Sequence, residues 1–250
     1  MGRLDGLAAI VTGGSRGIGR AVALAFAREG ADVAVVGARD QTALNEVEQK
    51  ILGLGRRALA AVADVARRAE VDHVMQRVLH DWGRIDVLVN NAGIIHPAPL
   101  EDISGEQWDE VIAVHLKGTF NCTQAVLPAM KRQRKGKIIN VAAPAALRAT
   151  FGVADYAAAK GGIMAFTRNA AVEFGPYNIQ VNCISPVAAT RMTDALYDFR
   201  SQHPSEVPAR AGRRPNVSPD AVAPAFLFFA SSDSDYITGQ VLAVDGGLTV

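Results

Sequence analysis

The sequence has little of what marks a disulfide-stabilised, metal-binding or membrane-spanning protein. Its two cysteines, Cys122 and Cys183, are too few for a disulfide framework and lack the spacing of a metal site. No apolar run approaches the roughly 18 residues of a membrane helix. The 26 basic residues nearly balance the 25 acidic ones, so no net charge attracts a nucleic acid. We therefore expect a cytoplasmic protein that binds no metal, membrane or nucleic acid.

Short β-branched runs alternate with longer helical stretches along the whole chain of 250 residues, which is typical of a parallel sheet covered by helices. The predicted fold is α/β: a single doubly wound Rossmann-type domain over residues 1–250, with a seven-stranded parallel sheet and helices on both faces. Strands are expected at 8–12, 32–36, 57–62, 85–89, 137–141, 179–184 and 241–244, and helices at 17–29, 41–52, 67–82, 105–131, 155–174 and 219–231. Residues 190–217, which contain Pro204, Pro208 and Pro215, fit either a substrate lid or a short helical insertion.

The first predicted strand runs directly into a glycine-rich turn. Gly13, Gly17 and Gly19 follow Thr12, and an apolar helix begins within the turn. Glycines there allow positive φ and a close approach of the backbone to a pyrophosphate, which the free amides at the helix start would bind. Glycines also make ordinary turns, so it is the order of strand, glycines and helix that favours a dinucleotide site.

Further motifs follow in order, and together with the glycine turn they resemble the short-chain dehydrogenase/reductase family. They are Asp64-Val65, Asn90-Asn91-Ala92-Gly93, Tyr156 with Lys160, Val181-Asn182, and Ile237-Thr238-Gly239-Gln240 before Asp245-Gly246-Gly247. The resemblance extends over nearly the whole chain. It implies a nicotinamide cofactor, a small-molecule substrate and a homotetramer that assembles through the helices at 105–131 and 155–174.

The resemblance also implies which residues contact the cofactor. They are Gly13, Ser15, Arg16, Gly17, Ile18 and Gly19 in the turn, Asp64 and Val65 beside the adenine, Asn91, Ala92 and Gly93 after the fourth strand, and Pro186 and Thr190 near the nicotinamide. Two of these have structural alternatives. Asn90-Asn91 could end a strand in a turn, and Asp64 could cap the helix that begins near Arg67.

The end of the second predicted strand indicates which form of the cofactor binds. An acidic side chain there would bind the ribose 2'-hydroxyl of NAD, whereas a 2'-phosphate requires guanidinium or ammonium groups. Gly37 occupies this position, and Arg16 and Arg39 could hold a phosphate from two sides. These charges favour NADP(H), although Asp40 adjoins Arg39.

Tyr156 and Lys160 lie one turn apart on the predicted helix at 155–174 and therefore share a face. An ammonium near a phenol stabilises the phenolate, which would lower the tyrosine pKa and allow proton exchange with a substrate oxygen. The family pattern makes Tyr156 the catalytic acid/base, and makes Lys160 its activator and a ligand of the nicotinamide ribose. It also places both Tyr156 and Lys160 among the residues that contact the cofactor. Outside that pattern, a Tyr/Lys pair at this spacing is an ordinary helix surface.

The reaction centre departs from the family pattern. Ala143 stands where the family has a serine that bonds the substrate carbonyl, and His115 stands where it has an asparagine on the long helix. Loss of one such donor costs about 10²- to 10³-fold in rate. Three explanations are open: the substrate needs little polarisation, His115 is a catalytic residue that supplies the donor, or the site catalyses non-redox chemistry. A lone histidine on an apolar helix is also often a core residue.

Val187 replaces the glycine that the family has after Pro186, so we expect the backbone of that loop to follow a different path.

The first hypothesis is an NADP(H)-dependent oxidoreductase that interconverts a carbonyl and a secondary alcohol. The segment Pro186-Val187-Ala188-Ala189-Thr190-Arg191-Met192-Thr193 is similar to the hydroxyacyl-CoA dehydrogenase branch of the family, which suggests a bulky or acyl-thioester substrate. Phe151, Phe199 and Met192 could line an apolar substrate cavity, or belong to the core. The alternative is a divergent member whose bound nucleotide supports dehydration, isomerisation or cyclisation, or ligand binding only. A purely structural partner protein is the least favoured.

Overall fold

A parallel sheet forms the centre of the computed structural model, which describes residues 2–207 and 215–249. Over that part of the chain the sheet has seven strands in the order β3-β2-β1-β4-β5-β6-β7. The strands are β1 Ala8–Thr12, β2 Asp32–Gly37, β3 Ala58–Val62, β4 Val87–Asn90, β5 Gly136–Val141, β6 Ile179–Pro186 and β7 Val241–Val244. The strand order reverses between β1 and β4, which confirms the predicted doubly wound α/β fold.

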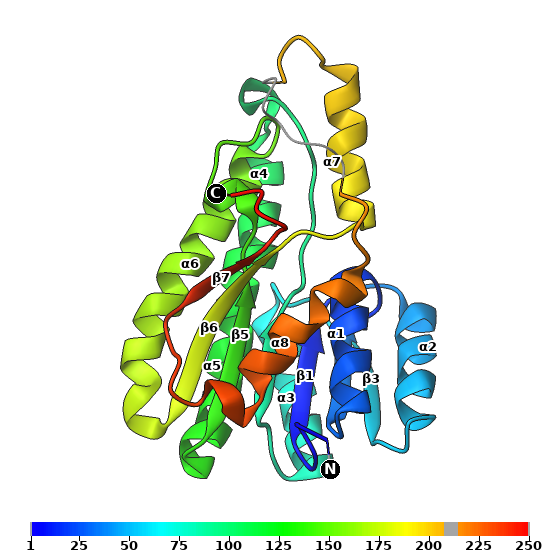
Figure 1. Cartoon of the computed structure of the whole chain (residues 1–250), viewed down its shortest axis with the longest axis vertical. Helices are drawn as coiled ribbons and strands as arrows, with labels where there is room; N and C mark the ends of the chain where they lie inside the picture. Colours follow the sequence, from blue (N-terminus) through cyan, green and yellow to red (C-terminus); the bar gives the residue numbers. More distant parts are fainter. Residues whose placement is uncertain (1, 208–214, 250) are drawn as a thin grey trace.

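Helices cover both faces of the sheet (Figure 1). On one face lie α1 Gly17–Arg28, α2 Gln41–Leu52 and α8 Ala223–Ala230, and on the other lie α3 Arg68–Trp82, α5 Gly118–Gln133 and α6 Ala154–Phe174. Alternate residues of a strand point to opposite faces, so Val33 and Val35 of β2 enter one core and Ala34 and Val36 enter the other. This double burial explains why the strands are continuously apolar.

The long helix predicted at 105–131 is interrupted. It consists of α4 Gly105–Ile112, a π-helical segment at Ala113–Lys117, and α5. The π segment is packed closely from two sides: a Cβ on Gly162 of α6 would lie 2.9 Å from Leu116, and one on Gly118 would lie 2.6 Å from Val65. Because π turns often occur at functional sites, the position of His115 within this one is informative.

Part of the unassigned stretch at 190–217 forms a helix, α7 Arg191–Gln202, which rises beyond the carboxyl edge of the sheet (Figure 1). Thr190 caps this helix, because its hydroxyl accepts the Thr193 amide and the Thr193 hydroxyl accepts the Thr190 amide. Pro208, which the sequence places in the same stretch, lies outside the described residues.

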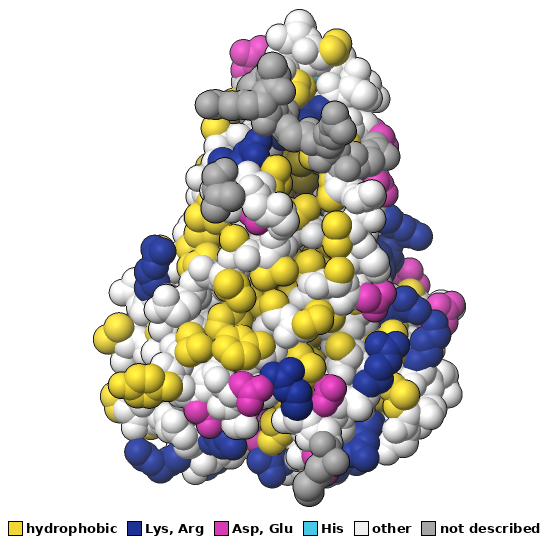
Figure 2. Space-filling view, viewed as in Figure 1, with side chains coloured by type: hydrophobic (Ala, Val, Ile, Leu, Met, Phe, Trp, Pro, Cys, Tyr) yellow, Lys and Arg dark blue, Asp and Glu magenta, His cyan; other side chains and the backbone are white. Residues whose placement is uncertain are grey.

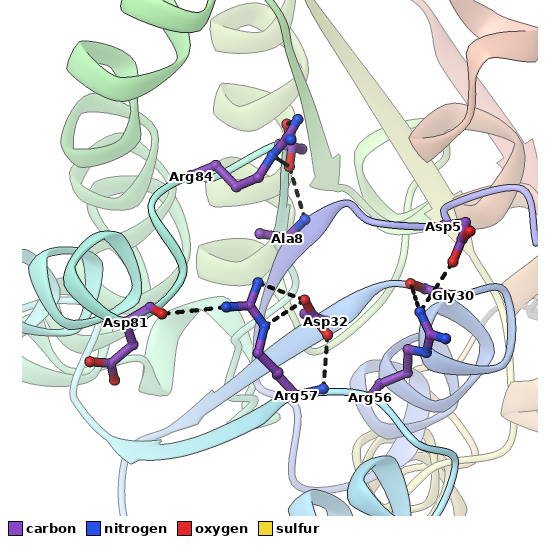
Figure 3. Close-up of polar contacts among 9 residues, drawn as sticks. Asp5, Ala8, Gly30, Asp32, Arg56, Arg57, Asp81 and Arg84 are labelled. Atoms are coloured by element: carbon purple, nitrogen blue, oxygen red, sulfur yellow. Dashed lines mark hydrogen bonds and ion pairs between the residues drawn. The ribbon is translucent and has the colours of Figure 1, made fainter.

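Arginine and aspartate side chains tie the amino ends of the strands together (Figure 3). Asp86 is buried, receives both Nε and Nη2 of Arg84, and accepts the amide of Ala8 at the start of β1. Arg57 also binds an aspartate, Asp32 at the start of β2, through its backbone amide and its Nε. With the amino edge fixed in this way, the loops at the carboxyl edge are the ones free to form a site. Among the described residues, no helix has the length and apolarity needed to cross a membrane.

Candidate functional site

The predicted site residues lie in the segments that follow the carboxyl ends of the strands or in the helices beside them, and a series of contacts joins most of them. A Cβ atom added to Gly17 would lie 3.4 Å from the Thr190 side chain, and a Cβ atom added to Gly13 would lie 2.8 Å from Nδ2 of the Asn91 side chain. Further on, Gly93 contacts His115, and His115 contacts Tyr156. The glycine turn and the Tyr/Lys pair therefore belong to one site.

In the part of the chain that the structure describes, no side chain caps the helix that begins in the glycine turn. Gly13 and Gly17 have φ values of 63° and 53°, which favour glycine. Arg16, the N-cap residue of α1, makes no side-chain cap, whereas Asp40, Ser104 and Thr190 cap α2, α4 and α7. Ile18 packs on the core beneath the turn. Uncapped amides at the positive end of a helix fit the pyrophosphate of a dinucleotide.

Thr12 connects the glycine turn to the end of β4. Its hydroxyl accepts the amides of Asn91 and Ala92, each at 3.0 Å. In return, Asn91 Nδ2 donates to the carbonyls of Thr12 at 2.9 Å and Gly13 at 3.3 Å. The amide donors of the Asn91 side chain are thus used to hold the turn. Thr12, which the sequence indicates only as the residue that precedes the glycines, joins the turn to the end of β4.

The two arginines predicted to hold a 2'-phosphate differ in their surroundings. Arg16 Nη2 pairs with Asp40 Oδ2 at 2.8 Å, and Asp40 Oδ1 accepts the Ala43 amide at 3.0 Å. Arg39 is exposed and makes no ion pair within the described part of the chain. Without a bound cofactor, Arg16 is therefore paired with the Asp40 carboxylate. Gly37 leaves the end of β2 without an acidic side chain, as expected.

Asp64 and Val65 follow β3, and hydrogen bonds hold both residues. Asp64 Oδ1 accepts the Ala66 amide at 3.0 Å, and this bond closes a local turn. The N-cap residue of α3 is Arg67 rather than Asp64. Val65 is buried in the core, and its carbonyl accepts Asn121 Nδ2 at 2.9 Å. The backbone of this segment is thereby fixed at the carboxyl edge.

The loop after β6 does not need the missing glycine. Val187 donates its amide to the Val244 carbonyl at 3.0 Å, and its φ is not positive. Pro186 ends β6 and continues the pairing with β7 through Val244. The backbone path here is thus one that a β-branched residue can adopt.

Lys160 lies next to the Tyr156 ring at the predicted reaction centre. Lys160 Nζ is 5.5 Å from the centroid of the tyrosine ring and donates to the Val141 carbonyl at 2.6 Å. Burial lowers the pKa of Lys160 to about 8. Burial also raises the pKa of Tyr156 above its ordinary value, which is opposite to the lowering expected from the nearby ammonium. In the protein alone, the Tyr156 phenol therefore holds its proton at neutral pH.

His115 projects from the π segment onto Tyr156. The two rings meet edge to face with centroids 5.1 Å apart. His115 Nε2 lies 2.7 Å from the Ile94 carbonyl oxygen and 3.0 Å from the Ile94 amide nitrogen, so Ile94 engages Nε2 in either tautomer. Within the described residues, Nδ1 is buried without a hydrogen-bond partner. Burial, and secondarily Lys160, lower the pKa of His115 to about 3. A Cβ on Gly93 would lie 2.3 Å from the ring, so glycine at this position admits the histidine.

Ala143 follows β5 and is buried, and its methyl group offers no hydrogen bond. Farther along the loop after β5, Phe151 stacks on Phe199 at 5.8 Å, and Phe199 packs on His203 at 4.3 Å. These contacts join the loop after β5 to α7.

Two buried polar clusters near the site were not anticipated. Asp155, directly before Tyr156, accepts the Tyr156 amide at 2.6 Å and Gln107 Nε2 at 3.0 Å, and Gln107 also donates to the His96 carbonyl. Asn90 and Asn140, paired across β4 and β5, bond to each other at 2.9 Å. A polar residue at the end of an otherwise apolar strand is the signal that could have found this asparagine pair.

Comparison with known protein families and sequences gives consistent matches. A family model described as enoyl-(acyl carrier protein) reductase matches residues 13–249. A 3-oxoacyl-(acyl-carrier-protein) reductase of Thermotoga maritima is 40% identical over 251 residues, covering 99% of this chain and all of that protein. The reductase of the same name from Chlamydia muridarum is 41% identical over 244 residues, covering 96% of each.

Solved structures are similar over their full length. Levodione reductase superposes with a TM-score of 0.88 at 31% identity, covering 98% of each chain. Carveol dehydrogenase from Mycobacterium avium, in complex with NAD, superposes with a TM-score of 0.90 at 28% identity, covering 99% of each chain.

The buried, neutral His115 predicts a specific loss of stability on acidification. Its pKa of about 3 in the folded protein lies below the value of roughly 6.5 in the unfolded chain, so the unfolded state binds a proton first as the pH falls. This group should lower the free energy of unfolding by about 1.4 kcal/mol per pH unit between those values. We expect the His115→Asn variant to lose less stability than the wild type between pH 6 and pH 4 in urea denaturation. The exposed His80→Asn variant is the control, and equal slopes for wild type and His115→Asn would contradict a buried neutral imidazole.

Proposed function

Because this chain belongs to the short-chain dehydrogenase/reductase family, we propose that it uses NADP(H) to interconvert a carbonyl and a secondary alcohol. The observation that carries the proposal is the continuous set of contacts from the uncapped glycine turn to Tyr156 and Lys160. The two relatives named 3-oxoacyl-(acyl-carrier-protein) reductase support a bulky acyl-thioester substrate with a 3-oxo group.

When bound, NADPH supplies a hydride to the substrate carbon. Tyr156 carries the matching proton on its phenol oxygen and donates it to the substrate oxygen, a role that its raised pKa favours at neutral pH. Lys160, largely charged at pH 7 with a pKa of about 8, stabilises the phenolate that remains. The free amides of the turn, together with Arg16 and Arg39, hold the phosphates. Asp64, Val65, Ala92, Pro186 and Thr190 would complete the cofactor contacts.

His115 and Ala143 make this reaction centre non-standard. Ile94 engages His115 Nε2 through its carbonyl and its amide, and Nδ1 is buried, so we do not assign His115 the role of the missing donor. We propose that His115 orients Tyr156 through the contact between their rings, and that Tyr156 polarises the carbonyl without help from residue 143. Such a centre suits a carbonyl that needs little polarisation.

A nicotinamide absorbance assay over 3-oxoacyl thioesters, simple ketones and secondary alcohols tests the redox proposal. We expect consumption of NADPH with at least one 3-oxoacyl thioester. Tyr156→Phe should lower kcat/KM by about 10²- to 10⁴-fold and leave NADPH binding intact, because only the transferable proton is lost. Tyr177→Phe, outside the site, is the matched control. Turnover of a substrate with no net change in the nicotinamide would contradict the proposal and favour the divergent, non-redox alternative.

Restoring a hydroxyl at residue 143 tests how the carbonyl is polarised. Ala143→Ser should raise kcat/KM for unactivated ketones by about tenfold or more, since one oxyanion donor is worth about 10² to 10³ in rate, and should change activity on activated carbonyls less. The neighbouring buried Ala142→Ser is the control for an added hydroxyl as such. An equal change for both substrate classes would show that polarisation is not what residue 143 limits.

We also propose a homotetramer that assembles through the helices at 105–131 and 155–174. Phe120 of α5 and Val172 of α6 are exposed by 44% and 79%, which is unusual for large apolar side chains. A second apolar area lies over β7 and α8 in Figure 2, where Leu242 is exposed. Val172→Glu should reduce the mass measured by light scattering from tetramer to dimer, whereas Leu54→Glu, in the turn after α2, should leave it unchanged. A monomeric wild-type protein would contradict the assembly.

Two further parts of the proposal concern the chain as a whole. We propose that residues 1–250 form one domain in which α7, the described helix of the stretch 190–217, covers the substrate, because Phe199 of α7 stacks on Phe151 in the loop before α6. Residues 208–214 of that stretch lie outside the described residues. We also propose that the protein acts in the cytoplasm, which its two free, buried cysteines fit.

A further inference from the structure

An acidic side chain holds one of the two arginines that the 2'-phosphate would need. We propose that Asp40 sets how strongly the protein prefers NADP(H) over NAD(H), because it pairs with Arg16 and must give it up, at least in part, to the phosphate. This inference rests on the proposed use of NADP(H), and it assigns a selectivity role to a residue outside the glycine turn.

The pair is placed where an incoming ligand can exchange with it. Arg16 Nη2 and Asp40 Oδ2 are 2.8 Å apart, and the two side chains are 49% and 43% exposed. An exposed ion pair contributes little stability, so a phosphate dianion can displace the carboxylate from the guanidinium. Only one Arg16 nitrogen is engaged by Asp40, which leaves the others available.

Asp40 itself is fixed and does not move away with its partner. Its Oδ1 accepts the Ala43 amide at 3.0 Å and caps α2, so the carboxylate stays at the start of this helix whatever Arg16 does. A phosphate that binds Arg16 therefore binds next to a fixed negative charge. The 2'-hydroxyl of NAD meets no such repulsion and can donate a hydrogen bond to a carboxylate.

The local charges therefore oppose each other. Arg39, exposed and without an ion pair in the described part of the chain, attracts a phosphate directly, and Arg16 does so once released. Asp40 weakens both attractions, because its carboxylate pairs with Arg16 and directly follows Arg39 in the chain. The preference for NADP(H) is then smaller than two arginines alone would produce.

The experiment measures the affinities of the cofactor-free protein for NADPH and NADH by calorimetry, and needs no substrate. Asp40→Asn keeps an oxygen that can cap α2 and removes the charge. We expect its NADPH Kd to fall about three- to fivefold, the range that loss of one exposed charge contact allows. The NADH Kd should stay constant or rise. Glu46→Gln removes the same charge from an exposed site on the same helix and is the matched control.

Variants of Arg16 and Arg39 show whether Asp40 acts through the proposed partner. In an Arg16→Met background, Asp40→Asn should change the ratio of the two affinities less than in the wild type. Arg39→Asp should shift the ratio toward NADH. Thermal unfolding of the cofactor-free Asp40→Asn protein checks the α2 cap, and Asp40→Ser, which can also cap, replaces it if that variant is unstable.

The outcomes separate the two proposals. An unchanged ratio in Asp40→Asn, or weaker NADPH binding, would overturn the role of Asp40 and leave the NADP(H) proposal standing. Failure of the wild-type protein to bind NADPH more tightly than NADH would instead refute the proposed cofactor preference, whatever Asp40 does.

Discussion

The hydroxyl of Thr12 holds together the two strand ends on which the site depends. It accepts the backbone amides of Asn91 and Ala92, while the Asn91 side chain returns hydrogen bonds to the carbonyls of the glycine turn. Because β1 and β4 are neighbours at the point where the strand order reverses, this one contact fixes the turn relative to the segment after β4. That segment in turn supports His115 through Gly93. The glycine turn and the part of the site that holds His115 and Tyr156 therefore have a common anchor.

Burial is the main cause of the pKa shifts of Tyr156, Lys160 and His115. It raises the pKa of Tyr156 and lowers those of Lys160 and His115, so each group is shifted toward its neutral form. For His115 the Lys160 charge acts in the same direction, and the result is a neutral ring whose Nε2 is engaged by Ile94. The histidine thus contributes an uncharged ring that packs against Tyr156, while Lys160 is the group that carries charge beside Tyr156 at neutral pH.

Much of the fold could be predicted from the sequence because its signals are local. Continuous apolar runs marked the strands, the glycine turn lay directly after β1, and Tyr156 and Lys160 fell one turn apart on a helix, as observed. The π segment could not be predicted, because it depends on packing against α6 and Val65 rather than on helical periodicity. The raised pKa of Tyr156 was missed for a related reason: spacing revealed the neighbouring ammonium but not the burial.

Pairs that are distant in sequence escaped the sequence reasoning for the same physical reason. Arg16 and Asp40 were both noted, but the geometry that joins the glycine turn to the α2 cap exists only once β1 and β2 are paired. Likewise, Asn90 and Asn140 become partners only across adjacent strands.

The alanine at residue 143 is consistent with this buried environment. A serine hydroxyl there would have to find a hydrogen-bond partner whenever no substrate is bound, and an unsatisfied buried hydroxyl costs about 1–3 kcal/mol. The Ala143 methyl group avoids that cost. Lys160 and His115 beside Tyr156 are buried, so the hydrogen bond that we propose from Tyr156 to a substrate oxygen would be stronger than it would be in water. One strong donor can then suffice for a carbonyl that is already polarised by its own neighbours, which is why the chemistry of the substrate, rather than an additional side chain, is expected to decide the rate.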